Sequence, residues 1–274
     1  MNIRNIMAIA QKDWLEVRQN KSAMISMMIV PFIFIVFLPL LITLILPGVS
    51  GGVESFVNDP DMQVFFTMMP ESMSRVLQGL DAAQIMIVTV LGYMFAPMFL
   101  IVPLMFSTTI AAESFAGEKE RKTLEALLYQ PISDKELFFG KVMAAGLPAI
   151  AVTWLCFFLY TIIVNAIPYA SFGRLWFPLP VWWLLIFWVS PALIAMSISL
   201  TVMISIKIQT FMGAYQTSSV VVLIVVVFFI GQITGVLFLS SLVTLVMGVA
   251  FWAITAIIGT IAIRSFSRQK LLTD

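Results

Sequence analysis

Six long apolar runs dominate the pattern of hydrophobic and polar positions along the chain. Each has about twenty residues or more, the length that an α-helix needs to cross a hydrocarbon layer roughly 30 Å thick. The runs occupy residues 23–46, 83–112, 142–166, 180–206, 214–235 and 241–263. The pattern therefore predicts an all-α polytopic membrane protein with six transmembrane helices, which form a single transmembrane domain over residues 1–274.

The connection between the fifth and sixth runs is short. Residues 231–241 read GQITGVLFLSS and contain two glycines and two serines. These residues interrupt the apolar pattern and leave little room for an external loop. A hairpin, a short re-entrant turn and a broken helix all fit this stretch.

The first 22 residues are amphipathic. At helical spacing their apolar side chains fall within about 100° of arc, and Lys12 and Glu16 lie on the other side. The apolar face consists of Ile3, Ile6, Met7, Ala10, Trp14 and Val17. This pattern predicts a helix that lies in the membrane interface before the first span. The alternative is a soluble helix packed on a partner protein.

Residues 47–82 form the longest segment between runs on the side opposite the N-terminus. Within it, residues 61–81 alternate apolar and polar positions at helical spacing and carry most of the external acidic charge. The segment is long enough for a surface helix or a small cap. It is too short for a folded outer domain.

Composition narrows the class of protein. Hydrophobic residues make up 61% of the chain and charged residues 11%, against roughly 25% charged residues in soluble domains. Fifteen Lys and Arg residues nearly balance fourteen Asp and Glu residues, so the chain lacks the basic field that nucleic-acid binding requires. We therefore expect the chain to contact membrane lipid and no nucleic acid.

The positive charges fall almost entirely on one side of the predicted topology. Only Arg75 and Arg174 lie on the other side. The thirteen remaining basic residues are Arg4, Lys12, Arg18, Lys21, Lys119, Arg121, Lys122, Lys135, Lys141, Lys207, Arg264, Arg268 and Lys270. By the positive-inside rule, both termini and residues 113–141 are expected in the cytoplasm of a multi-pass protein of the cell membrane.

Candidate catalytic groups are missing from the predicted spans. The chain has no His, and no Asp, Glu or Arg falls within the six runs. Such groups carry protons in coupled carriers, and they hold metals or activate water in hydrolases. The single cysteine, Cys156, has no partner for an intrachain disulfide. We therefore expect no catalytic residue, no metal site and no cofactor bound by this chain.

Residues 113–141 hold eleven of the charged residues in one internal segment. Charged pairs at i,i+4 spacing from Glu118 to Tyr129, with an apolar stripe, predict a short helix. The stripe consists of Leu124, Leu127 and Leu128. Pro131 ends this helix, and Ser133 with Glu136 forms a capping box that begins the next one. A helix held in this way beneath the membrane can pass movement between a soluble partner and the spans.

At these residues the chain resembles the permease subunits of type-2 ATP-binding-cassette exporters. The family pattern runs from an acidic residue at the end of the second span through Gly-Glu, Thr-Leu and Pro to Gly-Lys at the third span. The matching residues are Glu113, Gly117–Glu118, Thr123–Leu124, Pro131 and Gly140–Lys141. The resemblance in topology covers the whole chain, whereas the motif covers residues 113–141.

The resemblance implies that a helix in residues 113–141 docks on a separate ATPase subunit. The residues expected to couple to it are Glu113, Gly117, Glu118, Arg121, Thr123, Leu124, Leu127 and Leu128. No GxxxxGK[ST] pattern occurs in the chain, so ATP and Mg²⁺ are expected on that partner. A second permease subunit, identical or different, is also implied.

Three alternatives stay open from the sequence. The chain could be an energy-independent channel or facilitator, or a membrane assembly scaffold without transport, and residues 113–141 could be an ordinary charged loop. The substrate stays open as well, because small ions, peptides, lipids and hydrophobic drugs are all handled by the family that the chain resembles.

Overall fold

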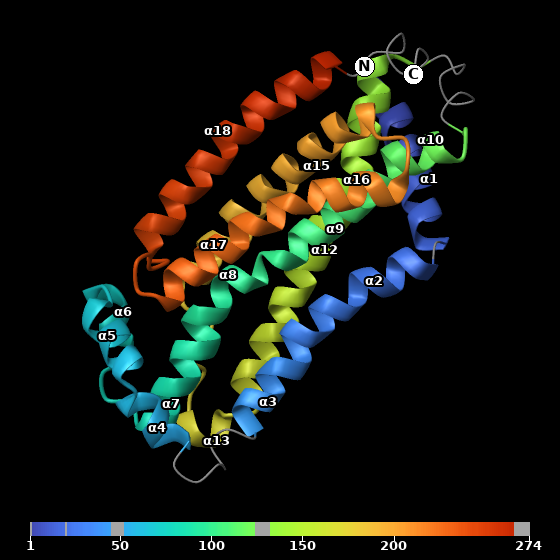
Figure 1. The fold of residues 1–274 in the computed structure, drawn as a ribbon. Helices are drawn as coiled ribbons and strands as arrows, with labels where there is room; N and C mark the ends of the chain where they lie inside the picture. The colour runs from blue at the N-terminus through green and yellow to red at the C-terminus, as the bar shows by residue number, and fades with distance from the viewer. Residues whose placement is uncertain (1, 20, 45–51, 124–131, 266–274) are drawn as a thin grey trace.

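The computed structural model describes residues 2–19, 21–44, 52–123 and 132–265, and within these residues all regular secondary structure is helical. Six helices are long and apolar enough to cross a membrane, as the sequence predicts. These spans are Met27–Leu44, Ala82–Glu120, Asp134–Ala166, Pro180–Lys207, Phe211–Ile233 and Ser241–Ser265, called the first to the sixth span. They run side by side along the long axis of the molecule (Figure 1).

Several spans consist of more than one helical piece. The first contains α2 (Lys21–Phe32), η1 (Ile33–Phe37) and α3 (Leu38–Leu44). The second contains α7 (Ala82–Ile87), η3 (Val88–Met94), α8 (Phe95–Phe99), α9 (Ile101–Ala112), η4 (Glu113–Gly117) and α10 (Glu118–Glu120). The third is α12 (Asp134–Ala166). The fourth contains α14 (Pro180–Leu184), η5 (Leu185–Val189) and α15 (Ser190–Lys207). The fifth contains α16 (Phe211–Ser218), η6 (Ser219–Val221) and α17 (Val222–Ile233), and the sixth is α18 (Ser241–Ser265).

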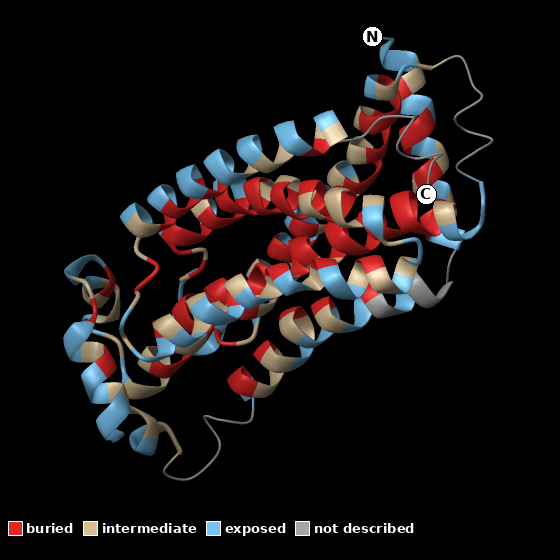
Figure 2. Cartoon of the chain, turned by 45° about the horizontal axis from the view of Figure 1, so that its top comes forward, coloured by how far each residue is buried: buried red, intermediate tan, exposed pale blue. Residues whose placement is uncertain are grey.

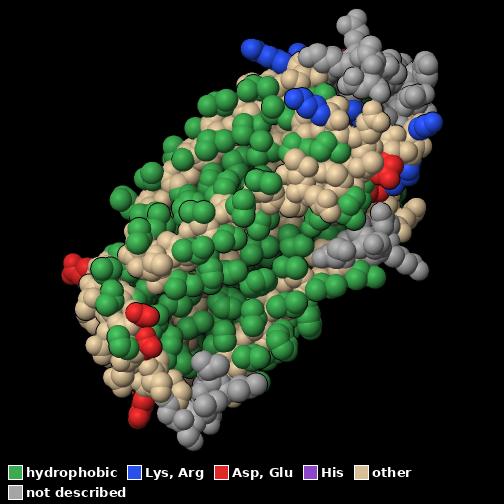
Figure 3. All heavy atoms as spheres, in the orientation of Figure 1, with side chains coloured by type: hydrophobic (Ala, Val, Ile, Leu, Met, Phe, Trp, Pro, Cys, Tyr) green, Lys and Arg blue, Asp and Glu red, His purple; other side chains and the backbone are tan. Residues whose placement is uncertain are grey.

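The second and fourth spans form the centre of the bundle. In each of them 72% of the apolar window is buried, against 22% to 33% in the other four. Buried residues follow the inner helices and exposed residues follow the outer ones (Figure 2). The visible side of the bundle is covered by hydrophobic side chains between its two ends (Figure 3). Such a surface is suited to lipid, because hydrocarbon favours apolar side chains around helices whose backbone groups are paired internally.

The two ends of the bundle differ in structure and charge. The N-terminal helix α1 (Ile3–Gln19) and α10 lie at one end (Figure 1). The other end carries α4 (Gly52–Asn58), α5 (Pro60–Met68), α6 (Glu71–Leu77) and α13 (Tyr169–Phe172). In the view of Figure 3, Lys and Arg side chains gather at the α1 end together with some Asp and Glu, whereas the charged side chains seen at the other end are Asp and Glu. The predicted external segment is thus a cap of short helices.

The connection between the fifth and sixth spans is a turn without a helix of its own. Helix α17 ends at Ile233, and Gly235 adopts a φ of +71° that favours glycine. The Leu237 N–H then donates to the Gly231 carbonyl at 2.8 Å. Of the three forms that fit the sequence, the structure has the hairpin.

Helix α1 forms as predicted, but its buried face is rotated from the predicted apolar face. Its buried residues are Ile6, Ile9, Ala10, Asp13 and Val17, and they pack toward α12. Ile3 is 76% exposed and Met7 43% exposed, although both belong to the predicted face. One side of the apolar stripe therefore packs on protein, and the other side is free for the membrane interface, where α1 is still predicted to lie.

Gly140 allows α1 and α12 to approach closely. A Cβ atom at this position would lie 2.8 Å from Ile9 Cβ and 3.2 Å from the Ile6 carbonyl oxygen. The Gly140→Ala substitution is expected to lower the free energy of unfolding by about 1–3 kcal/mol, because the two helices must move apart. Gly146→Ala in the same helix is the control, since its Cβ would meet only Ile198 Cδ1 at 3.6 Å. Equal thermal unfolding of the two purified variants would contradict this reading of Gly140.

Candidate functional site

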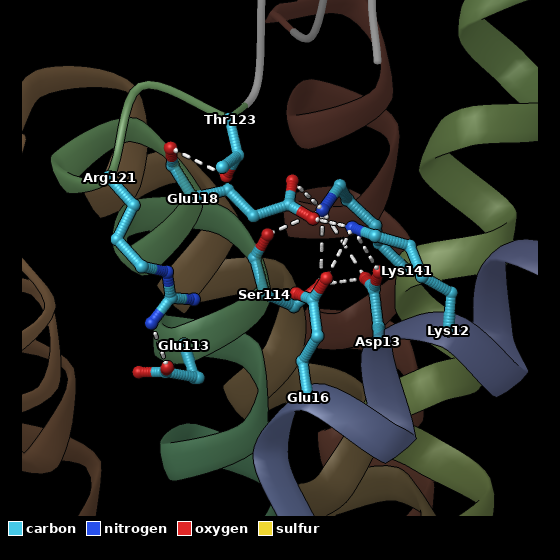
Figure 4. A network of polar contacts seen from close by, with 9 residues as sticks. All are labelled: Lys12, Asp13, Glu16, Glu113, Ser114, Glu118, Arg121, Thr123 and Lys141. Carbon is cyan, nitrogen blue, oxygen red and sulfur yellow. Dashed lines mark hydrogen bonds and ion pairs between the residues drawn. The ribbon is translucent and has the colours of Figure 1, made fainter. Parts of the chain in front are cut away.

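Charged side chains from three helices meet at the α1 end of the bundle (Figure 4). Helix α1 contributes three of them, and the end of the second span and α12 contribute one each. We call this group, together with the polar Ser114, the charged cluster; it consists of Lys12, Asp13, Glu16, Ser114, Glu118 and Lys141. Helical spacing explains the convergence within each helix, since Lys12 and Glu16, like Ser114 and Glu118, are four residues apart.

Lys141 is the centre of the charged cluster. Its side chain is completely buried, and its Nζ lies 2.5 Å from Glu118 Oε2 and 3.3 Å from Asp13 Oδ2. The same ammonium group donates to the Ser114 carbonyl at 2.5 Å and lies 5.3 Å from the centre of the Phe115 ring. A buried ammonium group is tolerated only when its protons are paired, and here carboxylates from two different helices pair them.

Lys12 closes the cluster from its more exposed side. Its Nζ is paired with Glu118 Oε1, and it lies 3.2 Å from Glu16 Oε1 and 3.3 Å from Asp13 Oδ1. Burial alone would lower the pKa of Lys12, but the hydrogen bond to Glu118 and the three carboxylate charges outweigh burial and raise the pKa above its usual value. Glu118 therefore lies between two lysines. One is Lys12 of α1, and the other is Lys141 of α12, the last residue of the sequence motif.

A second ion pair runs along another face of the same helix end. Arg121 Nη1 lies 2.7 Å from Glu113 Oε1, and the hydrogen bond to this buried carboxylate raises the pKa of Arg121. Gly117 lies between them, one turn from each. A Cβ atom there would lie 3.0 Å from Glu113 Oε2 and 3.4 Å from Arg121 Nη2. The glycine of the motif thus leaves room for the pair to cross the helix surface.

The second span is longer than predicted and ends in a helix-terminating turn. It continues beyond residue 112 to Glu120. Lys122 adopts a φ of +57°, its N–H bonds to the Lys119 carbonyl, and the Thr123 N–H bonds to the Glu118 carbonyl. This is the Schellman arrangement. The prediction that a separate helix begins at Glu118 is therefore wrong at its start, and Glu118 pairs with lysines of other helices instead of with Lys122.

Lys119 and Glu120 connect this helix end to the fourth and fifth spans. Lys119 Nζ donates to the carbonyls of Ser205 and Ile206 at 3.0 and 3.1 Å, at the C-terminal end of α15. Glu120 Oε2 accepts from the Phe211 N–H at 2.8 Å, at the first residue of α16. Each charge is placed at the helix end whose dipole it complements.

The capping box at the start of α12 is confirmed. Ser133 is the N-cap residue, its hydroxyl oxygen accepts from the Glu136 N–H at 3.3 Å, and Glu136 Oε2 accepts from the Ser133 N–H at 3.0 Å. Glu136 Oε1 also accepts from the Asn2 N–H at 2.5 Å. The box therefore also connects the start of the third span to the beginning of α1.

The predicted coupling residues divide into two groups. The structure brings Glu113, Gly117, Glu118, Arg121 and Thr123 together at the end of the second span. Leu124, Leu127 and Leu128, together with Pro131, lie outside the described residues. Sequence reasoning missed the roles of Asp13 and Ser114 and the burial of Lys141. For Asp13 a signal existed, because it falls within the stretch of α1 that also supplies the apolar face.

The charged cluster pairs three carboxylates with two ammonium groups. Ligand oxygens of Asp13, Glu16 and Glu118 lie within 4.8 Å of one another, a spacing that a cation can use. Two lysine ammonium groups already lie among these oxygens and neutralise most of their charge. The arrangement is suited to holding helices in a fixed relation, so that a displacement of one is passed to the others.

The chain is thus a six-span helical membrane protein whose second span ends in a buried ion network with α1 and α12. A family model described as "ABC-2 family transporter protein" matches residues 7–239, and the chain belongs to this family. The match includes α1 from Met7 onward, the first five spans and the whole charged cluster. No curated protein and no solved structure gives a significant match to the chain.

Proposed function

We propose that the chain is the membrane-spanning subunit of an exporter that moves its substrate with energy from ATP hydrolysis on a separate nucleotide-binding subunit. The partner engages the chain through residues 113–141. The observation that supports this proposal best is the set of contacts around residues 118–120. Consecutive residues there bind α1 and α12 through Glu118, the end of α15 through Lys119 and the start of α16 through Glu120.

This arrangement gives a route from a docked partner to the spans. A force applied to the chain after Thr123 acts first on the end of the second span, because the Schellman turn joins them directly. Buried ion pairs then pass the displacement to α1 and the third span, and the contacts of Lys119 and Glu120 pass it to the fourth and fifth. Close packing of Ala112 and Ala116 with Ala214 of α16 supports the same transfer.

The proposed function implies a source of energy and two kinds of partner subunit. The family membership supports an ABC transporter permease, and the chain has no GxxxxGK[ST] pattern with which to bind ATP itself. We therefore assign ATP and Mg²⁺ to an ATP-binding-cassette partner. A second permease subunit completes the pathway, because the outer spans of one copy are mostly exposed and offer an apolar face for association within the membrane.

We propose that the α1 end is cytoplasmic. Cysteine introduced at Gln19, which is exposed at this end, should be protected from a membrane-impermeant thiol reagent in intact cells. Cysteine at Val236, which is 85% exposed at the connection of the last two spans, should react. The native Cys156 is buried and serves as the internal blank. Labelling at position 19 and protection at position 236 would reverse the orientation.

The proposed function is tested by purifying the chain from native membranes with a C-terminal tag and identifying what remains bound. A P-loop ATPase is expected to co-purify, and the complex is expected to hydrolyse ATP. The discriminating control is the chain alone in lipid vesicles. Solute movement by the chain without ATP would favour the channel, and absence of both ATPase and transport would favour a scaffold.

A further inference from the structure

Three consecutive carbonyl groups of the second span accept side-chain hydrogen bonds from three other spans. They belong to η3, where the Leu91 carbonyl accepts from Tyr160 Oη, the Gly92 carbonyl from Trp182 Nε1 and the Tyr93 carbonyl from Gln232 Nε2. Each bond is 2.7 Å long. The donors come from α12, α14 and α17, so the third, fourth and fifth spans all hold this part of the second span.

The Tyr93 carbonyl can accept a side-chain hydrogen bond because a proline removes its α-helical donor. Pro97 lies four residues later in α8 and has no N–H, so the carbonyl of Tyr93 lacks its ordinary α-helical donor. A carbonyl that is left unpaired is costly in a membrane interior. The Tyr93 carbonyl accepts instead from the Phe95 N–H and from Gln232 Nε2. Turns of π-helix such as η3 are frequent at functional sites.

Tyr160 and Trp182 belong to a rigid aromatic core. Both side chains are completely buried, and their rings stack with centroids 5.1 Å apart at an angle of 20°. The Trp182 ring also lies against Phe99 of the second span at 5.3 Å and against Phe177 at 4.8 Å. Aromatic packing therefore holds the second, third and fourth spans together even without the hydrogen bonds of these two donors.

Gln232, the third donor, lies outside the aromatic core, in a helix that is mostly exposed. Of the twelve residues of α17, only Val225 and Gln232 are buried. The helix ends one residue after Gln232, and Leu223, Val227 and Ile230 are all more than half exposed. The Gln232 Oε1 atom is buried but has no hydrogen-bond partner among the described residues. Among the described residues, the Gln232 amide thus provides a hydrogen bond from this end of a largely exposed span to the second span, and the oxygen of that amide is unsatisfied.

We propose that Gln232 is a positioning residue that acts as the releasable attachment of the fifth span to a rigid body of the second, third and fourth spans. When the bond to the Tyr93 carbonyl breaks, the outer end of α17 moves away from η3 and α8 while the aromatic core keeps its packing. The inference deepens the proposed function and rests on it for its meaning, because such a movement opens the end of the bundle opposite the coupling site.

The experiment measures this movement directly in the purified full-length chain. Spin labels are placed on cysteines at Ser171 and Val236, both exposed, in a background with Cys156→Ala. Ser171 reports the rigid body, since its carbonyl accepts from Gln84 Nε2 of α7 at 2.8 Å. Val236 reports the end of the fifth span. The distance distribution between the labels needs neither ATP nor substrate, so its result is independent of whether an ATPase co-purifies.

Four variants are compared. Gln232→Met keeps the size of the side chain but removes the donor, and it is expected to broaden the distribution and lengthen the distance by about 5 Å, the size of a one-turn shift. Tyr160→Phe removes a neighbouring bond of the same set and is expected to match the parent chain. Gln232→Glu is expected to match the parent at about pH 5, where the protonated carboxyl group can donate, and to match Gln232→Met at about pH 9. Gln232→Asn is too short to reach and should also resemble Gln232→Met.

Three results would overturn the proposal. The first is a parental distribution in Gln232→Met, which would mean that packing alone holds the fifth span. The second is an equal opening in Tyr160→Phe, which would mean that Gln232 has no special role. The third is a Gln232→Glu variant that resembles Gln232→Met at both pH values, which would separate the movement from the hydrogen-bond donor.

Discussion

Replacing Lys141 by methionine is expected to lower the free energy of unfolding by about 3–5 kcal/mol, the usual cost of removing one partner from a buried ion pair. Lys141 is fully buried, and the substitution removes the buried one of the two cations that Glu118 and Asp13 share, while Lys12 remains. Both carboxylates are 1% exposed. This is a large share of the roughly 5–15 kcal/mol that stabilises a typical domain. The measurement is thermal unfolding of the detergent-solubilised chain, together with its yield from membranes.

Two further variants separate charge burial from loss of charge. Lys135→Met makes the same change in α12 at an exposed position and is expected to be nearly neutral. Adding Glu118→Gln to Lys141→Met removes one of the two carboxylates that have lost Lys141, so the double variant is expected to recover part of the lost stability. If Lys141→Met and Lys135→Met unfold at the same temperature, the charged cluster does not hold α1 and the two spans together.

Placing a charge in the leucine stripe is expected to separate the chain from the proposed ATPase partner. In the proposed interface, Leu124→Asp or Leu127→Asp would put an unpaired carboxylate against a desolvated surface, at a cost of roughly 2–4 kcal/mol. Association should weaken by about 30-fold to 1000-fold. Insertion should be unaffected, because the site lies outside every span and the count of basic residues is unchanged. Affinity of purified permease for the ATPase subunit measures the effect.

The control for the stripe is Leu175→Asp, the same substitution at a residue that is 72% exposed at the opposite end of the bundle. It should leave the affinity unchanged. Glu118 and Arg121 are poor places to test docking, since both hold the helix end together and their loss would mix stability with binding. Unchanged affinity in both leucine variants would mean that the leucine stripe does not dock on an ATPase subunit.

The spans and the capping box could be predicted from the sequence, but the burial of Lys141 at the centre of the charged cluster could not. A transmembrane span can be predicted from the sequence, because about twenty apolar residues in a row have few other stable arrangements. The Ser133 and Glu136 box is equally local, since both hydrogen bonds form within one helical turn. The burial of Lys141 is not local. It depends on the crossing of α1 and α12 at Gly140, and on Glu118 being carried onto the same side by the second span.

The end of the second span shows why helix boundaries are the hardest part to predict. A run of charged residues after Ala112 indicates the end of an apolar run, and hydropathy places the boundary there. The helix continues to Glu120 because its charges are satisfied by neighbouring helices and need no water. The i,i+4 pairs predicted within the segment compete with these tertiary partners, and the tertiary partners win because they are buried and less screened.

The central claim is that this chain works as one part of an ATP-driven complex engaged through residues 113–141. The mass of the intact complex, measured on detergent-solubilised material by native mass spectrometry, tests it most directly. Two permease subunits with two ATP-binding subunits are expected for the parent chain, and permease subunits alone for Leu127→Asp. A parent chain that carries no ATPase and still transports its substrate, or a Leu127→Asp complex of unchanged mass and abundance, would contradict it.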